Sequence, residues 1–94
     1  MQKSTHTKEY DLVRAELKAA RESARLTQRA LAERLGVPHS WIAKVEAGER
    51  RIDVVELCWF LAACGRPSSP TLAELSKKIT LSRPKQSGRR GRSA

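Results

Sequence analysis

Apolar residues recur along the chain at the three- and four-residue spacing of amphipathic α-helices. The spacing first occurs over residues 10–24, where Val13, Leu17 and Ala20 fall on one face. It returns in four later segments, and no segment shows the strict alternation of apolar and polar residues that is typical of a β-strand. The pattern therefore predicts an all-α domain of five helices.

Two short segments in the middle of the chain are separated by a glycine and a proline. The first begins after Thr27, a suitable N-cap, and ends at Gly36, which supplies the left-handed backbone of a tight exit. The second begins at Pro38, whose fixed φ suits the first turn of a helix, and ends at Gly48. Two helices joined by a turn of three or four residues form a helix-turn-helix, whose second helix enters the major groove of DNA.

The second of these helices is expected to have an apolar side and a narrow outward edge. Ile42 and Val45 should face the core. The outward edge consists of mostly small residues: His39, Ser40, Ala43, Lys44 and Ala47. Such an edge fits a groove about 12 Å wide, in which Lys44 reaches guanine acceptors and His39 donates to a base or a phosphate. For both residues, the alternative is an ordinary solvated helix face.

A fourth helix is predicted from Asp53 to Gly65. Asp53 and Glu56 have the spacing of a capping box. Because the segment between Val54 and Gly65 is apolar nearly all round, we expect this helix to be the central one.

A fifth helix follows the breaker cluster at residues 66–70, with Ser69 or Thr71 as its cap. We expect its apolar face to form the seam of a homodimer, with a contribution from Trp59 and Phe60 of the fourth helix. The seam residues are Leu72, Leu75 and Ile79. The alternative is that this face only covers the core of its own protomer.

The net charge of +9 is distributed unevenly over the 94 residues. Twelve Lys and Arg residues accompany ten Asp and Glu residues up to Glu74, whereas seven basic and no acidic residues follow it. The sequence therefore predicts a flexible arm over residues 1–9, one helix-turn-helix domain over residues 10–81, and a disordered basic tail over residues 82–94. We expect the tail to contact a polyanion, and the alternative is that it only improves solubility.

Several function classes lack the residues they need. No apolar run is long enough to cross a membrane, and the N-terminus lacks a secretory pattern, so we expect a cytoplasmic protein. Cys58 and Cys64 match neither a redox motif nor a zinc site and are expected to be buried. His6 and His39 are the only histidines, and no acid–base pair has a catalytic spacing. We therefore expect no enzymatic activity, no metal and no cofactor.

The stretch LTQRALAERLGVPHSWIAKVEAGERR, residues 26–51, resembles the phage repressor and Cro-type helix-turn-helix regulators, an XRE-like family. A looser resemblance covers residues 17–65. It implies that Gln28 binds a backbone phosphate and that the loop over residues 49–51 lies along the phosphates. It also implies a salt bridge between Arg21 and Glu46.

The chain departs from the pattern of this family at three positions. Pro38 stands where a Ser or Thr usually caps the third helix, and Arg25 stands where a Gly commonly ends the first. Trp41 replaces a usual Thr or Ser. The indole either packs against the core, which gains a large buried area, or donates its N–H to a phosphate.

The candidate DNA contacts fall into two groups by their chemistry. Those assigned to phosphates are Gln28, Arg29, Arg50 and Arg51. The resemblance assigns base edges to His39, Ser40 and Lys44, and we place Pro38 and Trp41 on the same surface. Phosphate contacts fix the register and base edges give the specificity.

The sequence therefore predicts a regulator of transcription that binds double-stranded DNA as a homodimer. We expect it to act as a repressor, and the promoter of its own gene is one expected target. The alternative is an antitoxin, whose tail or fifth helix would also bind a toxin protein. The tail favours the first reading, because a segment that binds a basic toxin would more often be acidic.

Overall fold

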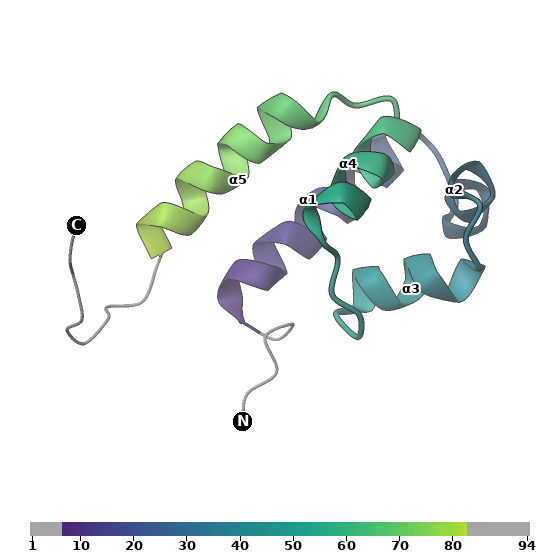
Figure 1. Ribbon diagram of the computed structural model, residues 1–94, viewed down its shortest axis with the longest axis horizontal. Coiled ribbons are helices and arrows are strands. Elements are labelled where there is room, and N and C mark those ends of the chain that lie inside the picture. Colours follow the sequence, from purple (N-terminus) through teal and green to yellow (C-terminus); the bar gives the residue numbers. More distant parts are fainter. Residues whose placement is uncertain (1–6, 83–94) are drawn as a thin grey trace.

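The predicted five-helix architecture is confirmed by a computed structural model, which describes residues 7–82 and the side chains of residues 7–79. The helices are α1 (Lys8–Ser23), α2 (Gln28–Leu35), α3 (His39–Ala47), α4 (Val54–Ala63) and α5 (Ser68–Ser82). Residues 7–82 contain no strand. In Figure 1, α1 and α4 lie in the middle of the molecule, with α2 and α3 on one side and α5 on the other.

The ends of the helical part differ from the sequence-based boundaries by one or two residues. α1 begins at Lys8, inside the stretch assigned to the arm, because the Thr7 hydroxyl caps it by accepting from the backbone N–H of Tyr10 at 3.1 Å. α5 includes Ser82, the first residue assigned to the tail. The rest of the predicted arm and tail, residues 1–6 and 83–94, lies outside the described residues.

Side chains that the sequence marks as caps fix the starts of α2 and α4. The Thr27 hydroxyl accepts from the backbone N–H of Ala30 at 3.0 Å. Asp53 accepts from the N–H of Glu56 at 2.8 Å, and the Glu56 carboxylate accepts from the N–H of Asp53 at 3.0 Å. Both predicted caps are therefore confirmed, and each satisfies N–H groups that the helix leaves unpaired.

The turn between α2 and α3 consists of Gly36, Val37 and Pro38. Gly36 has a φ of +71°, the left-handed conformation that glycine adopts without a steric penalty. Pro38 has an extended ψ of 150° and is therefore the N-cap residue of α3, one position before the first turn in which we expected it. It offers no side-chain cap, so the start of α3 depends on the fixed φ of the ring.

The core joins the two helices of the helix-turn-helix to α1 and α4. Its largest fully buried side chains are Leu17, Leu31, Ile42, Val45, Phe60 and Leu61. Complete burial of such a side chain contributes about 1.5–3 kcal/mol relative to leaving it exposed. Since α2 and α3 each insert residues into this shared core, their relative orientation is fixed by packing.

Only one face of α4 is buried in this core. We predicted that this helix would be the central one, but its other face is exposed. Leu57, Phe60 and Leu61 are buried, whereas Val55 and Trp59 are 53% and 59% exposed. Periodicity could not separate these two faces because both are apolar. The chain contributes no further described helix to cover the outer one.

α5 begins at Ser68, so neither Ser69 nor Thr71 occupies the N-cap position that we predicted. Thr71 is instead buried inside the first turns of the helix. The breaker cluster ends earlier than expected because Pro70 is tolerated in the first turn of a helix, where its missing N–H has no partner to lose.

The corner between α1 and α2 contains a strained residue. Arg25 has a φ of 59° and is the one non-glycine residue with a positive φ between residues 7 and 82.

We expect Arg25→Gly to raise the free energy of unfolding by about 1 kcal/mol, because glycine adopts this φ without the clash of a Cβ atom. Urea unfolding followed by circular dichroism measures the change. Arg25→Ala is the control, since it removes the charge and keeps the strain; an equal gain from alanine would contradict the explanation.

Candidate nucleic-acid interface

The outward edge of α3 is exposed, as its residue pattern predicts. Ile42 and Val45 are 0% and 1% exposed and face the core. The exposed residues on the remaining side are His39, Ser40, Lys44 and Ala47, and Ala43 is half-buried between them. Small side chains on both sides of one lysine leave a narrow ridge, which is the shape that enters a major groove.

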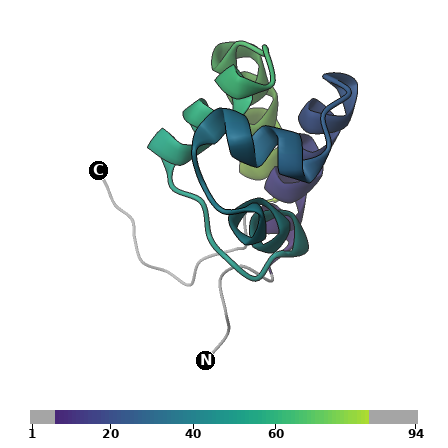
Figure 2. The same ribbon diagram turned by 90° about the vertical axis from the view of Figure 1, so that its right-hand side faces the viewer.

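α2 and α3 cross steeply at one end of the molecule. Figure 1 looks along α2 and across α3, and Figure 2 shows the reverse, with α3 seen close to end-on. The N-terminal turn of α2 carries Gln28 and the exposed Arg29. This arrangement places a polar helix start beside the outward helix, which is the geometry of a helix-turn-helix.

A nearly buried ion pair ties α1 to α3. The Arg21 guanidinium donates from Nε to Glu46 Oε2 at 2.7 Å and from Nη2 to Oε1 at 2.9 Å, and these are the two residues that the family resemblance pairs. The Glu46 side chain is only 4% exposed. Hydrogen bonding to Glu46 raises the pKa of Arg21 above its ordinary value. Arg21 also donates to the carbonyl of Leu26 at 2.8 Å, so one side chain orders both α3 and the corner before α2.

Glu46 also holds Gln28, a contact that the sequence did not predict. The Gln28 amide donates to Glu46 Oε1 at 3.0 Å. An amide NH₂ group has two hydrogens, so this bond orients Gln28 and leaves a second donor for a ligand. The buried pair of Arg21 and Glu46 therefore also positions the side chain that we predict to bind a phosphate.

Arg14 of α1 fixes the end of α3 and was missed by the sequence analysis. Its Nη1 donates to the carbonyl of Glu46 at 3.1 Å, and its guanidinium pairs with Asp11. A Cβ atom at Gly48 would lie 3.0–3.2 Å from the Arg14 side chain. Gly48 also has a φ of +80°, so the backbone geometry favours glycine here, and a larger residue would also have to displace Arg14. The available signal was that Arg14 and Arg21 are seven residues apart and lie on one face of α1.

Trp41 in the first turn of α3 and Arg50 in the loop after α3 lie against each other. Trp41 is half-buried and packs on the core, and the Arg50 guanidinium carbon lies 4.7 Å from the centre of its ring. Arg50 also donates to both oxygens of Glu56 at 3.2 Å. We predicted a phosphate contact for Arg50, and in this structure its guanidinium is engaged within the protein.

The remaining candidate contacts, Pro38 and Arg51, are exposed. Arg51 occupies the loop between α3 and α4, and Pro38 lies at the start of α3. Arg29, Lys44 and Arg51 are exposed cations in the first turn of α2, on α3 and in the loop after α3. Their roles toward DNA stay predictions.

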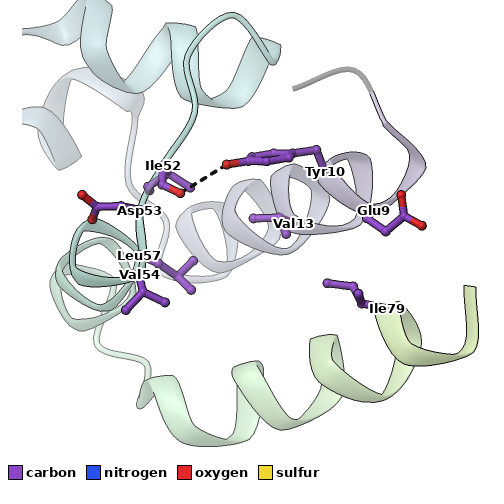
Figure 3. A pocket seen from close by; sticks show the side chains of 8 residues that line it. All are labelled: Glu9, Tyr10, Val13, Ile52, Asp53, Val54, Leu57 and Ile79. Atoms are coloured by element: carbon purple, nitrogen blue, oxygen red, sulfur yellow. Dashed lines mark hydrogen bonds between the residues drawn. The ribbon is translucent and has the colours of Figure 1, made fainter. Parts of the chain in front are cut away.

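The three residues predicted for the dimer seam do not form an exposed stripe. Leu75 is 3% exposed, and Leu72 packs against the core of its own protomer. Ile79 lines a cavity of about 240 Å³ between α1, α4 and α5, near the hydrogen bond that the Tyr10 hydroxyl donates to the carbonyl of Ile52 (Figure 3). Leu72 and Leu75 of α5 thus cover the core of their own protomer, and a dimer seam on α5 stays a prediction.

Among residues 7–82, no three His, Cys, Asp or Glu side chains gather as they would around a metal ion. Cys64 is buried and Cys58 half-buried, and burial raises the pKa of the Cys64 thiol. Within the same residues, every helix is too short or too polar to cross a membrane.

The fold and the exposed edge of α3 define an all-α protein built around a helix-turn-helix. A family model described as "Helix-turn-helix domain" matches residues 12–76, well over half of the chain. The protein belongs to this helix-turn-helix family, which is consistent with the resemblance to XRE-like regulators. The curated proteins contain no match to the chain.

Proposed function

We propose that the protein is a sequence-specific regulator of transcription that binds double-stranded DNA in the cytoplasm and represses promoters, including its own. The observation that carries this proposal is the exposed edge of α3, held at a fixed tilt by the pair of Arg21 and Glu46. A rigid, narrow helix edge with one lysine suits readout of bases, and nothing in the proposal requires catalysis.

In this proposal the position of each side chain determines whether it contacts a base or a phosphate. His39, Ser40 and Lys44 approach base edges from the N-terminal half and the middle of α3. Gln28, Arg29 and Arg51 bind phosphates on either side, which fixes the register of α3 in the groove. Pro38 and Trp41 shape the surface between these groups.

The test compares Lys44→Ala with Gln28→Ala on a DNA site selected from a random library and on a scrambled duplex. Lys44→Ala should weaken binding to the selected site by about 10-fold to 100-fold and relax the preference at one base position per half-site. Gln28→Ala should weaken binding to both duplexes equally, because phosphates are the same in every sequence. Binding is measured by fluorescence anisotropy at fixed salt. An equal loss of sequence preference in both variants would contradict these roles, and no binding by the wild type would contradict the proposal.

We also propose a homodimer, because one such unit presents too small a surface for tight specific binding. Phe60 is fully buried, so of the two α4 residues that we considered for the seam only Trp59 is accessible. Val55 lies one turn before it on the same exposed side. An antitoxin would instead bind a second protein through its tail or α5, and the mass of the complex purified from its own cells distinguishes the two.

A further inference from the structure

The half-buried guanidinium of Arg50 contacts three different groups of the protein. Its Nη1 and Nη2 donate to Oε1 and Oε2 of Glu56, each at 3.2 Å. Nη1 also donates to the carbonyl of Arg51 at 2.6 Å, and the guanidinium stacks 4.7 Å from the centre of the Trp41 ring. A bidentate pair with a stacked face uses the geometry that guanidinium groups favour.

Glu56 has two roles at this position. Its carboxylate closes the capping box of α4 by accepting from the backbone N–H of Asp53 at 3.0 Å, and it pairs with Arg50. The hydrogen bond from Arg50 is the main cause that lowers the pKa of Glu56, and the one from the Asp53 backbone adds to it. Glu56 therefore carries a full negative charge at neutral pH.

A paired arginine contributes little to the binding of a polyanion. An arginine that binds a phosphate strengthens the complex by releasing counterions from the DNA, and a carboxylate bound to the same guanidinium cancels much of that charge. Arg50 and Arg51 are neighbours in the loop beside α3. Arg50 pairs with Glu56, whereas the exposed Arg51 pairs with no carboxylate of residues 7–79.

We infer that Glu56 limits the affinity for DNA by holding Arg50 on Trp41 and away from the phosphates. The inference rests on the proposed DNA binding and adds to it a residue that sets the strength of the complex. Trp41 belongs to the first turn of α3, so the Arg50 guanidinium is held next to the outward edge of α3, which we propose to face DNA. Removal of the negative charge at residue 56 should release Arg50 to a phosphate.

The decisive variant is Glu56→Gln, because glutamine at this position keeps the capping box and removes only the charge. At 50 mM salt, Glu56→Gln should bind DNA at least about threefold more tightly than the wild type. One extra phosphate contact makes binding more sensitive to salt, so this gain in affinity should fall by about threefold per protomer when the salt is raised to 200 mM. The gain should be equal on a selected site and on a duplex of random sequence, since phosphates carry no sequence information. Fluorescence anisotropy with both duplexes measures it.

Two further variants separate the release of Arg50 from a general effect of charge. Glu49→Gln removes one negative charge from the same loop, and Glu49 is exposed. It should give a clearly smaller gain than Glu56→Gln. Arg50→Gln should change the affinity of the wild type little and abolish the gain of Glu56→Gln. Thermal unfolding checks that each variant is folded.

The possible results have distinct meanings. Equal gains from Glu49→Gln and Glu56→Gln would overturn the inference, as would an Arg50→Gln variant that weakens the wild type as much as it weakens Glu56→Gln. A wild type that binds DNA while Glu56→Gln shows no gain would overturn the inference and leave the proposed function standing. A wild type that binds neither duplex would overturn the proposed function itself.

Discussion

Arg21→Met is expected to lower the free energy of unfolding by about 3–5 kcal/mol. The change leaves the carboxylate of Glu46, whose side chain is 4% exposed, without its bidentate partner in the interior. A charge that has lost its partner and is shielded from water costs far more than the pair contributes when intact. Domains of this size are stable by about 5–15 kcal/mol, so the variant should unfold at much lower urea concentrations.

The double variant Arg21→Met with Glu46→Leu provides the control. Two apolar side chains of similar length fill the same space and leave no buried charge, so stability should return to within about 1–2 kcal/mol of the wild type. Urea unfolding of all four proteins in this cycle gives the coupling energy directly. A single variant that loses less than about 1 kcal/mol would show that water reaches Glu46 and that the pair is not a structural determinant.

The same double variant separates stability from function. It should be folded, yet it lacks the Glu46 oxygen that holds the Gln28 amide at 3.0 Å. We therefore expect it to bind DNA more weakly on every sequence, as Gln28→Ala does. Full affinity in the double variant would show that Gln28 finds its phosphate without being positioned.

The features that the sequence predicted well are local ones. The five helices, the hydroxyl cap of Thr27, the capping box of Asp53 and the left-handed Gly36 all depend on residues within a few positions of one another. The inward direction of Ile42 followed from helical periodicity alone. These signals were sufficient for the fold class and for the exposed edge of α3.

The features that the sequence missed depend on contacts between helices or across a loop. The bond from Gln28 to Glu46 joins α2 to α3, and periodicity carries no information on it. Arg50 reaches Glu56 from the loop between α3 and α4, and helical periodicity does not predict the course of a loop. In α4 the apolar pattern runs all round the helix, so it does not show which residues the core covers. Tertiary packing buries Phe60 and leaves Trp59 exposed.

Trp59→Glu is expected to convert the proposed homodimer into a monomer and to weaken binding to a DNA site with two half-sites by about 100-fold or more. Trp59 is 59% exposed on a face that it shares with Val55, and a carboxylate there would be buried without a partner in the dimer. The loss is large because linked half-sites gain about 10²–10⁴ in affinity from binding together. Sedimentation gives the mass, and anisotropy on duplexes with one or two half-sites gives the affinity.

Two comparisons test whether this effect arises from the dimer. Ala73→Glu adds the same charge at an exposed position of α5 and should leave mass and affinity close to the wild type. On a duplex with a single half-site, Trp59→Glu should bind as the wild type does, because no second protomer takes part there. A Trp59→Glu protein that stays dimeric would place the seam elsewhere. An equal loss on the single half-site would mean that the carboxylate acts on DNA directly, since the contacts of α3 with one half-site do not involve α4.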